Sequence, residues 1–293
     1  MPIFRYQMNG HWYKGNTHIH STASDGGKNF SELAQMYSAA GYHFLCRTDH
    51  WVASAVGADR QEYPLLWLDG IELDGRDQAG AAYHVVALGS FTGLQREMGL
   101  DKAIETARDQ GGMLVLAHPQ WLGNSFEDAI KWKFDGVEVY NHVCHWLNGK
   151  GDGGTYWNAM LKRFPGTLAL AADDAHLQPD RPGWNGGWVM VNAADCTEEA
   201  ILAALRAGNY YSTCGPTIDS IRYDGEQVTI QCSPVQFARL VGPDHLGDRT
   251  GSFDGKMFTQ AAFKVRHDWP YAYLEIEDAQ GRRAWSNPIF ISD

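Results

Sequence analysis

Long apolar segments are absent from this sequence of 293 residues. No stretch approaches the roughly 18 to 20 apolar residues that a membrane-spanning helix needs. The N-terminal segment MPIFRYQMNGHWYKG also lacks the basic and then apolar pattern of a signal peptide. We therefore expect a cytoplasmic protein that does not bind a membrane. Hydrophobic residues make up 44% of the chain, which is enough to build a packed core.

Cysteine is scarce and never forms a C-x-x-C pair. The five cysteines are far apart in the chain: Cys46, Cys144, Cys196, Cys214 and Cys232. An odd number at such spacings predicts neither a disulfide framework nor a thiolate zinc site. We expect reduced thiols that are mostly buried.

Basic residues are outnumbered, with 24 lysines and arginines against 35 acidic residues and a net charge of -11. This balance argues against the broad basic surface that binds duplex nucleic acid. A small anionic substrate remains compatible with the sequence if local cations offset the acidic residues. The composition leaves the oligomeric state open.

Strand-like and helical patterns alternate over about the first 210 residues. Apolar, β-rich runs such as HFLCRTDH, MLVLAHP and TLALAADD are separated by helical patterns, one of which, residues 125–132, opens with Ser-x-x-Asp. This alternation predicts a parallel sheet, either open or closed as a barrel. After residue 216 the runs are short and alternating without a helical period, which predicts a small antiparallel β domain. We therefore expect domains at 1–216 and 217–293.

Histidine and carboxylate clusters recur where the predicted strands end. In His18-Ile19-His20 both imidazoles can reach one ion, since alternate residues of a strand share a face. Similar clusters close later runs: Asp49-His50, Glu72, His118-Pro119 and Asp173-Asp174-Ala175-His176. Any one of them could be a helix cap or a hydrogen-bonded core histidine. In parallel α/β folds, however, the carboxyl ends of strands share one face, so we expect the clusters to converge there.

The motif series HIHSTASDG, TDH, a glutamate after a strand, AHP and DDAH resembles that of the PHP (polymerase and histidinol phosphatase) superfamily of metal-dependent phosphoesterases. The resemblance covers roughly residues 11–216. The run GWVMVNAADCTEEAILAALRAGNYYSTCGPTI and the ending AWSNPIFI resemble a stand-alone branch related to a carbaryl hydrolase. The resemblance implies a distorted (β/α)7 barrel with two or three metals at its C-terminal rim, followed by a small sandwich-like antiparallel β domain.

The resemblance also implies a ligand for every position of a three-metal pattern. The first ion would take His18, His20, Glu72 and Asp174; Glu72 would bridge to a second ion with His84 and His118; a third would take Asp25, His50 and His176. His84 begins its apolar run instead of ending it, so a packed strand histidine is the alternative there.

These ligand types suit zinc, manganese or iron, among which sequence does not choose. Two ions about 3.5 to 4 Å apart under a bridging carboxylate lower the pKa of a shared water, which would make Glu72 catalytic. The leading hypothesis is a hydrolase of small phosphoesters, because three divalent ions against three carboxylates leave a positive surplus that suits a phosphate group. The alternatives are an ester or carbamate hydrolase using the same metals, and a non-catalytic metal-binding accessory module.

Other polar and aromatic residues are candidates for supporting roles. Asp49, Asp173 and Glu138 could orient imidazoles, or could be caps and salt-bridged acids. Arg47, Arg181 and Lys150 could bind a substrate anion, and Arg181 in the loop LQPDRPGWNGG is the preferred one. His142 and His145, in the loop after GVEVYN, could protonate a leaving group or lie on the surface. Four tryptophans near the clusters could line a pocket or pack loops: Trp51, Trp121, Trp184 and Trp188.

Overall fold

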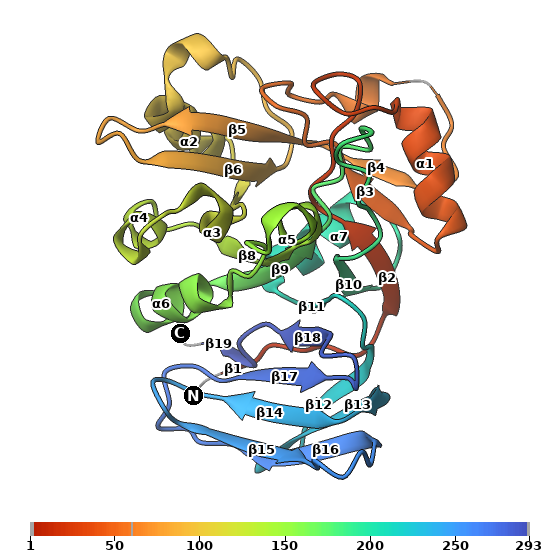
Figure 1. Ribbon diagram of the computed structural model, residues 1–293, viewed down its shortest axis with the longest axis vertical. Coiled ribbons are helices and arrows are strands. Elements are labelled where there is room, and N and C mark those ends of the chain that lie inside the picture. The colour runs from red at the N-terminus through yellow and green to blue at the C-terminus, as the bar shows by residue number, and fades with distance from the viewer. Residues whose placement is uncertain (1–2, 60, 292–293) are drawn as a thin grey trace.

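The computed structural model describes residues 3–59 and 61–291 (Figure 1). Its first part carries eleven strands: β1 (Ile3–Phe4), β2 (His11–Asn16), β3 (Phe44–Cys46), β4 (Leu66–Leu68), β5 (Gly70–Arg76), β6 (Ala82–Leu88), β7 (Met113–Leu116), β8 (Gly136–Asn141), β9 (Leu168–Ala172), β10 (Trp188–Ala193) and β11 (Tyr210–Thr213). Its helices are α1 (Phe30–Ala39), α2 (Leu100–Asp109), α3 (Pro119–Leu122), α4 (Phe126–Lys131), α5 (His142–Asn148), α6 (Gly154–Arg163) and α7 (Glu198–Ala207). None of the described helices combines the length and the apolar character needed to cross a membrane.

Local sequence explains where the helices begin. Ser125 caps α4, its hydroxyl accepting from the Asp128 backbone N–H while the Asp128 carboxylate accepts from the Ser125 N–H. This reciprocal pair is the capping box that the Ser-x-x-Asp pattern predicts. Asn29 and Glu32 form the same arrangement at the start of α1.

The strands of the first part are only partly parallel. The order β5-β6-β7-β8-β9 forms one sheet, in which β7, β8 and β9 are parallel, and β2, β3 and β4 are parallel in a second sheet. β6, however, is antiparallel to both of its neighbours. The expectation of a purely parallel sheet is therefore wrong, because residues 77–81 form a turn too short for the crossover that parallel neighbours require.

Two isolated parallel bridges join these two sheets at the carboxyl ends of their strands. Ile19, just after β2, pairs with Ala175, just after β9. His50, after β3, pairs with Glu72 in β5. The segments that carry the predicted metal ligands are thus held side by side by backbone pairing.

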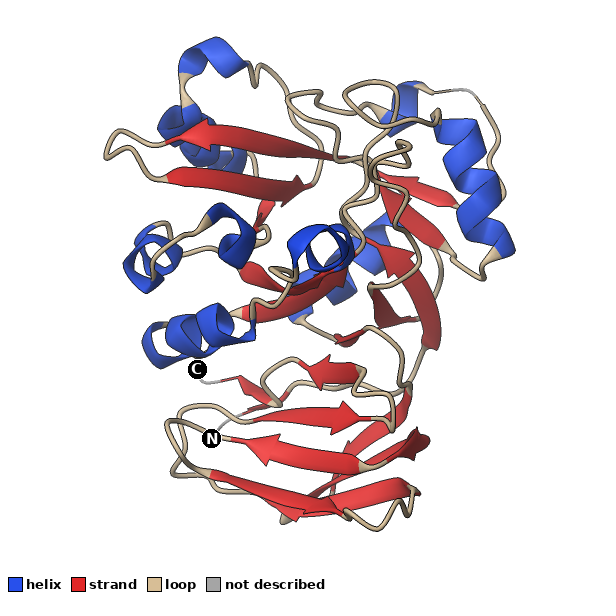
Figure 2. Ribbon diagram, viewed as in Figure 1, coloured by secondary structure: helices blue, strands red, loops and turns tan. Residues whose placement is uncertain are grey.

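The strands after residue 217 are all antiparallel: β12 (Ile218–Tyr223), β13 (Gln227–Val235), β14 (Phe237–Val241), β15 (Gly247–Gly251), β16 (Phe258–Lys264), β17 (Tyr273–Glu277), β18 (Arg283–Ser286) and β19 (Phe290–Ile291). β12, β13 and β16 form one sheet. Their buried residues share one apolar core with β14 and β17, so two sheets pack face to face, as in a sandwich. Figure 2 shows only strands and loops in this lower part.

The C-terminal strands are continuous with the first part of the chain. β18 pairs with β11, which places β15-β14-β17-β18-β11-β10-β2-β3-β4 in a single nine-stranded sheet. The N-terminal strand β1 in turn pairs with β19. The division at residue 216 stays a prediction, since the hydrogen bonding of the sheet runs across it.

Candidate metal centre

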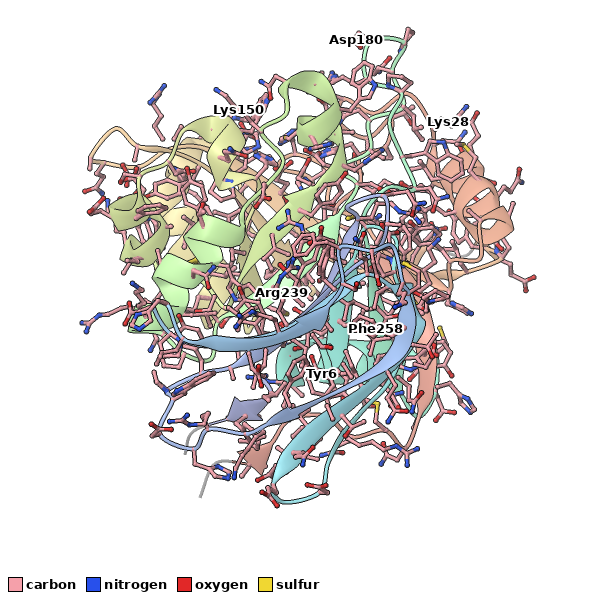
Figure 3. All side chains as sticks on the ribbon, turned by 60° about the horizontal axis from the view of Figure 1, so that its bottom comes forward. Tyr6, Lys28, Lys150, Asp180, Arg239 and Phe258 are labelled. Atoms are coloured by element: carbon pink, nitrogen blue, oxygen red, sulfur yellow. The ribbon has the colours of Figure 1, made fainter. Side chains whose placement is uncertain are left out.

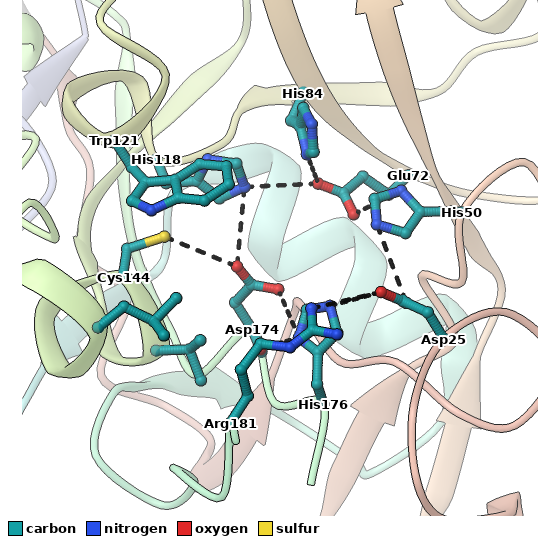
Figure 4. A pocket seen from close by; sticks show the side chains of 12 residues that line it. Asp25, His50, Glu72, His84, His118, Trp121, Cys144, Asp174, His176 and Arg181 are labelled. Carbon is teal, nitrogen blue, oxygen red and sulfur yellow. Dashed lines mark hydrogen bonds and ion pairs between the residues drawn. The ribbon is translucent and has the colours of Figure 1, made fainter. Parts of the chain in front are cut away.

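A cavity of about 390 Å³ opens at the carboxyl ends of the strands (Figure 4). Seven of the nine predicted metal ligands line it: Asp25, His50, Glu72, His84, His118, Asp174 and His176. The remaining two, His18 and His20, are fully buried beneath it. The structure therefore brings all nine predicted ligands to one place.

His18 and His20 face the same two carboxylates. Their Nε2 atoms lie 3.2 Å apart. His20 Nε2 is 3.2 Å from Glu72 Oε2 and 3.1 Å from Asp174 Oδ1, and the corresponding distances from His18 Nε2 are 3.3 and 3.4 Å. Ile19, between them, is buried in the apolar core, as the alternation of a strand requires.

Glu72 stands at the middle of the cluster. Its Oε1 atom lies 2.8 Å from His84 Nδ1 and 3.5 Å from His118 Nε2. Its Oε2 atom faces His18 and His20, and lies 3.2 Å from His50 Nδ1. The two oxygens of one carboxylate thus serve two different histidine groups, which is the geometry of a bridging ligand.

A third group lies beside the first two. His176 Nε2 is 3.2 Å from Asp25 Oδ2, and His50 Nε2 is 4.0 Å from Asp25 Oδ1. Five sets of side chains bring ligand atoms within 4.8 Å of one another: His20, Asp25, His50 and His176; His18, Glu72 and His118; His18, His20 and Asp174; His50, Glu72 and His84; and His118, Cys144 and Asp174. Cys144 is the one member that sequence did not predict.

The donor set fits divalent transition ions. Glu72 Oε2 and His20 Nδ1 are buried and have no hydrogen-bond partner among the described residues. Leaving such atoms unpaired costs about 1 to 3 kcal/mol each, and a cation would satisfy them. Imidazole nitrogens with carboxylate oxygens suit zinc, iron and manganese.

The buried acids and imidazoles shift one another's pKa. Burial disfavours the charged carboxylates, but His18 and its neighbouring imidazoles outweigh burial and lower the pKa of Glu72 and Asp174. Burial likewise opposes the charged imidazoles, yet Asp174 and Glu72 raise the pKa of His18 well above its ordinary value and that of His20 to about 9.

Glu138, in β8, orients the ligands from below. Its Oε1 atom accepts a hydrogen bond of 2.7 Å from His18 Nδ1, and its Oε2 atom accepts one of 2.9 Å from the backbone N–H of His118. Asn141, which sequence reasoning missed, donates 2.8 Å to Glu138 Oε2 and 3.3 Å to Asp174 Oδ2. Of the two roles considered for Glu138, orienting an imidazole is the one that this geometry supports.

Asp49 and Asp173 orient loops instead of imidazoles. Asp49 accepts hydrogen bonds from the backbone and hydroxyl groups of Ser21 and Ser24. Asp173 accepts from the Tyr37 hydroxyl and from three backbone N–H groups at residues 185–187. Neither carboxylate hydrogen-bonds an imidazole within the described ranges, so the first role considered for them is wrong.

The candidate cations take different positions. Arg181 lines the cavity, with its Nη1 atom 3.5 Å from Asp25 Oδ2. Arg47 is buried elsewhere, 2.6 Å from Asp59 and over the ring of Phe30. Lys150 is exposed and does not line the cavity (Figure 3). Arg47 and Lys150 are therefore not placed to bind an anion in this cavity, and the expectation is wrong for both.

His142 and His145 belong to helix α5, not to a loop as expected. The face of α5 that lines the cavity carries Val143, Cys144 and Leu147. His142 lies against the backbone of residues 183–186 and 3.2 Å from the Tyr140 hydroxyl, and His145 is exposed. Neither histidine lines the cavity, which removes the expected leaving-group acid.

Among the four tryptophans, Trp121 lines the cavity, its ring 5.4 Å from that of His118. The others do not line it. Trp51 donates to the Asp74 carbonyl, Trp184 packs on Tyr37, and Trp188 lies under the Lys14 ammonium.

Asp74 is a further neighbour of the site that sequence reasoning missed. Its carboxylate is 3.0 Å from His50 Nδ1 and accepts two hydrogen bonds of 2.8 Å from Arg96. The sequence spacing could have predicted it, because Asp74 follows Glu72 by two residues on one strand and therefore lies on the same face.

Comparisons with known proteins bear on the fold. No family model matches the chain, and no curated protein matches it significantly. A two-domain protein from Bacteroides vulgatus ATCC 8482, described as containing a predicted PHP-like metal-dependent phosphoesterase, superposes with a TM-score of 0.55 and 14% identity over 92% of this chain and 91% of that chain. An amidohydrolase from Chromobacterium violaceum has a TM-score of 0.41 and 17% identity over 55% of this chain and 87% of that chain, too weak a likeness to inform the fold. The PHP-like fold expected from the motifs is confirmed by the first similarity, whose low identity leaves the activity open.

Replacing Glu138 by glutamine is expected to weaken zinc binding by about 10- to 100-fold, because the ligand His18 loses the carboxylate that fixes its ring. Competition against a chromophoric chelator measures the affinity. Glu127→Gln, on an exposed position of α4, is the matched control and should leave it unchanged. Equal affinities in the two variants would contradict the role assigned to Glu138.

Zinc binding to the metal-free protein at pH 7 is expected to release protons. With its pKa raised to about 9, the His20 imidazole is protonated at pH 7 and must become neutral to bind an ion. The pKa of His18 is raised as well, which acts in the same direction. The affinity should therefore rise with pH up to about 9. Calorimetric titration in two buffers of different ionisation enthalpy measures the protons released, and His20→Gln should release about one fewer. Identical enthalpies in both buffers would rule the expectation out.

Proposed function

We propose that this chain is a metal-dependent hydrolase of small phosphoesters. The observation that carries the proposal is the Glu72 carboxylate, whose two oxygens face separate histidine groups while Oε2 has no hydrogen-bond partner among the described residues. Such an arrangement suits two ions sharing one carboxylate. The similarity in fold to a PHP-like protein is consistent with it.

We further propose that the two sheets together make up a distorted (β/α)7 barrel. Seven strands, β2, β3 and β5 to β9, follow one another in a ring when the bridges His50 with Glu72 and Ile19 with Ala175 are counted as links. The ligands would then lie at its C-terminal rim, where barrels of this kind place their active sites.

The proposed ligands are those implied by the motifs. One ion would be held by His18, His20, Glu72 and Asp174, a second by Glu72, His84 and His118, and a third by Asp25, His50 and His176. Divalent zinc, manganese or iron ions in these positions would supply Lewis-acid catalysis and lower the pKa of water.

Charge favours a phosphate group over a neutral one at this site. Three divalent ions would bring six positive charges against three from Asp25, Glu72 and Asp174. Asp74 does not change this balance, because Arg96 neutralises it with two hydrogen bonds. Glu138, which accepts from His18 Nδ1, lowers the surplus by one charge and leaves it positive. Arg181 adds a further positive charge at the cavity, where its guanidinium could bind phosphate oxygens.

The other wall of the cavity is apolar. Trp121, Val143 and Leu147 line it beside the ionisable ligands, with Trp121 next to His118. We infer that this wall contacts an apolar leaving group, such as an aryl ring. The same wall would suit an aryl ester or carbamate, which makes hydrolysis at a carbonyl carbon the second candidate.

Replacing His20 by alanine is expected to remove bound metal and to abolish hydrolysis of an aryl phosphate, because His20 contacts both Glu72 and Asp174. Metal analysis and turnover are measured together, with the exposed His245→Ala as control. Retention of both metal and turnover in His20→Ala would refute the proposal. Aryl esters and carbamates are assayed in parallel. Turnover of these alone selects the second candidate, and bound metal without any turnover indicates an accessory module.

Replacing Arg181 by alanine is expected to lower kcat/KM for an aryl phosphate by about 10-fold or more, since a hydrogen bond to a charged group contributes about 1.5 to 3 kcal/mol. The corresponding neutral aryl ester should be hydrolysed, if at all, at an unchanged rate. Arg181→Lys keeps the charge without the guanidinium fork, so its kcat/KM for the aryl phosphate should fall between those of the wild type and Arg181→Ala. Equal losses on charged and neutral substrates would contradict an anion-binding role.

A further inference from the structure

Cys144 places its sulfur inside the candidate metal centre. Cys144 lies on the face of α5 that lines the cavity, and it is 2% exposed. Its Sγ atom is 3.9 Å from Asp174 Oδ2, and Figure 4 shows it directed at that carboxylate. The Asn141 side chain caps α5 by accepting 3.0 Å from the Cys144 N–H, which fixes the residue in this orientation.

His118 provides an independent sign of a ligand at the same point. Its side chain is 2% exposed, and its buried Nδ1 atom has no hydrogen-bond partner within residues 3–59 and 61–291. Its Nε2 atom faces the cavity, 3.7 Å from Asp174 Oδ2 and 3.5 Å from Glu72 Oε1. Nε2 is therefore the ring nitrogen that is placed to bind an ion beside Asp174.

We propose that Cys144 donates its sulfur to the second of the proposed ions, the one assigned to His118, and that Asp174 contributes its Oδ2 atom to the same ion. The ligand atoms of these three residues all lie within 4.8 Å of one another. A tetrahedral zinc site, with bonds of about 2.0 to 2.3 Å, separates its ligand atoms by roughly 3.5 Å. The observed 3.9 and 3.7 Å spacings therefore need to close by only a few tenths of an ångström.

The alternative for Cys144 is an ordinary thiol that donates to Asp174. At 3.9 Å this contact is long and contributes little. The two arrangements differ in the fate of the proton, because the thiol releases it to solvent when the sulfur binds an ion. No change in oxidation state is involved.

Sulfur coordination narrows the choice of metal at this position. A thiolate is a soft ligand that favours zinc, and its cobalt and cadmium replacements, over manganese. The inference rests on the proposed function, since it names the metal preference of the same centre. The set Asp25, His50 and His176 contains no sulfur, so it serves as an internal reference within the protein.

Cobalt(II) added to the metal-free, full-length protein tests the inference. A sulfur ligand produces a near-ultraviolet charge-transfer absorption that nitrogen and oxygen ligands do not, while the visible bands report bound cobalt from any ligand set. Cys144→Ser and Cys144→Ala are compared with Cys196→Ser. Cys196 lies in the turn after β10, outside all five candidate ligand sets, and its nearest polar partner is the His43 carbonyl at 3.8 Å.

The wild type and Cys196→Ser are expected to show the charge-transfer absorption, and both Cys144 variants to lose it while keeping visible bands. The ratio of zinc affinity to manganese affinity should fall at least about 10-fold in Cys144→Ser. Loss of a residue that only orients a ligand already costs about 10-fold, and loss of the ligand itself should cost no less. Visible bands without charge-transfer absorption in the wild type, or absorption that persists in Cys144→Ser, would overturn the inference and leave the proposed function intact. A wild type that binds no cobalt and no zinc would overturn both.

Discussion

The burial of two carboxylates among imidazoles is the constraint on which this structure depends. Glu72 is 1% exposed and Asp174 is 5% exposed. Removing an ionised group from water costs several kcal/mol unless opposite charges and hydrogen bonds compensate. The compensating imidazoles come from segments far apart in the chain, so the centre exists only once the strand ends are assembled. The bridges of Ile19 with Ala175 and His50 with Glu72 hold those ends together by backbone pairing, independently of any ion.

The C-terminal strands contribute to this assembly through β9, the strand that leads into Asp174. One edge of β9 pairs with β8. On its other edge, Ser212 accepts from the Ala171 N–H and donates to the Ala169 carbonyl, and Asn287 accepts from the Ala169 N–H. Side chains from β11 and the segment after β18 therefore replace a neighbouring strand there and satisfy buried backbone groups. Asn287 is the contribution of the C-terminal region to this edge.

Sequence could predict the ligands that end strands, because a period of two residues and a common sheet edge are local rules. That reasoning reached His18, His20, Glu72 and their neighbours. His84 came only from the family resemblance, since nothing in its own run distinguishes a ligand from a packed histidine.

Helix α5 shows most clearly what sequence could not predict. Its start at Asn141 sets the helical phase, which directs Cys144 into the cavity and leaves His142 and His145 outside. A shift of one residue changes the direction of a side chain by about 100°, and no sequence pattern fixed that phase. The antiparallel β6 was missed because a five-residue turn, not a helix, connects it to β5.

The net charge of the chain and the charge at the cavity are different quantities. Among the described residues, exposed acids only slightly outnumber exposed bases, and the field of exposed charges is screened within about 10 Å at 0.1 M salt. Of the acids near the cavity, Asp49 and Asp173 are satisfied by loop donors and Asp74 by Arg96. Asp25, Glu72, Asp174 and Glu138 then face the imidazole clusters, and in a buried site neighbouring groups act with little screening. In the proposed function, an anionic substrate would be selected by the ions that these acids would hold. An overall charge of -11 does not argue against it.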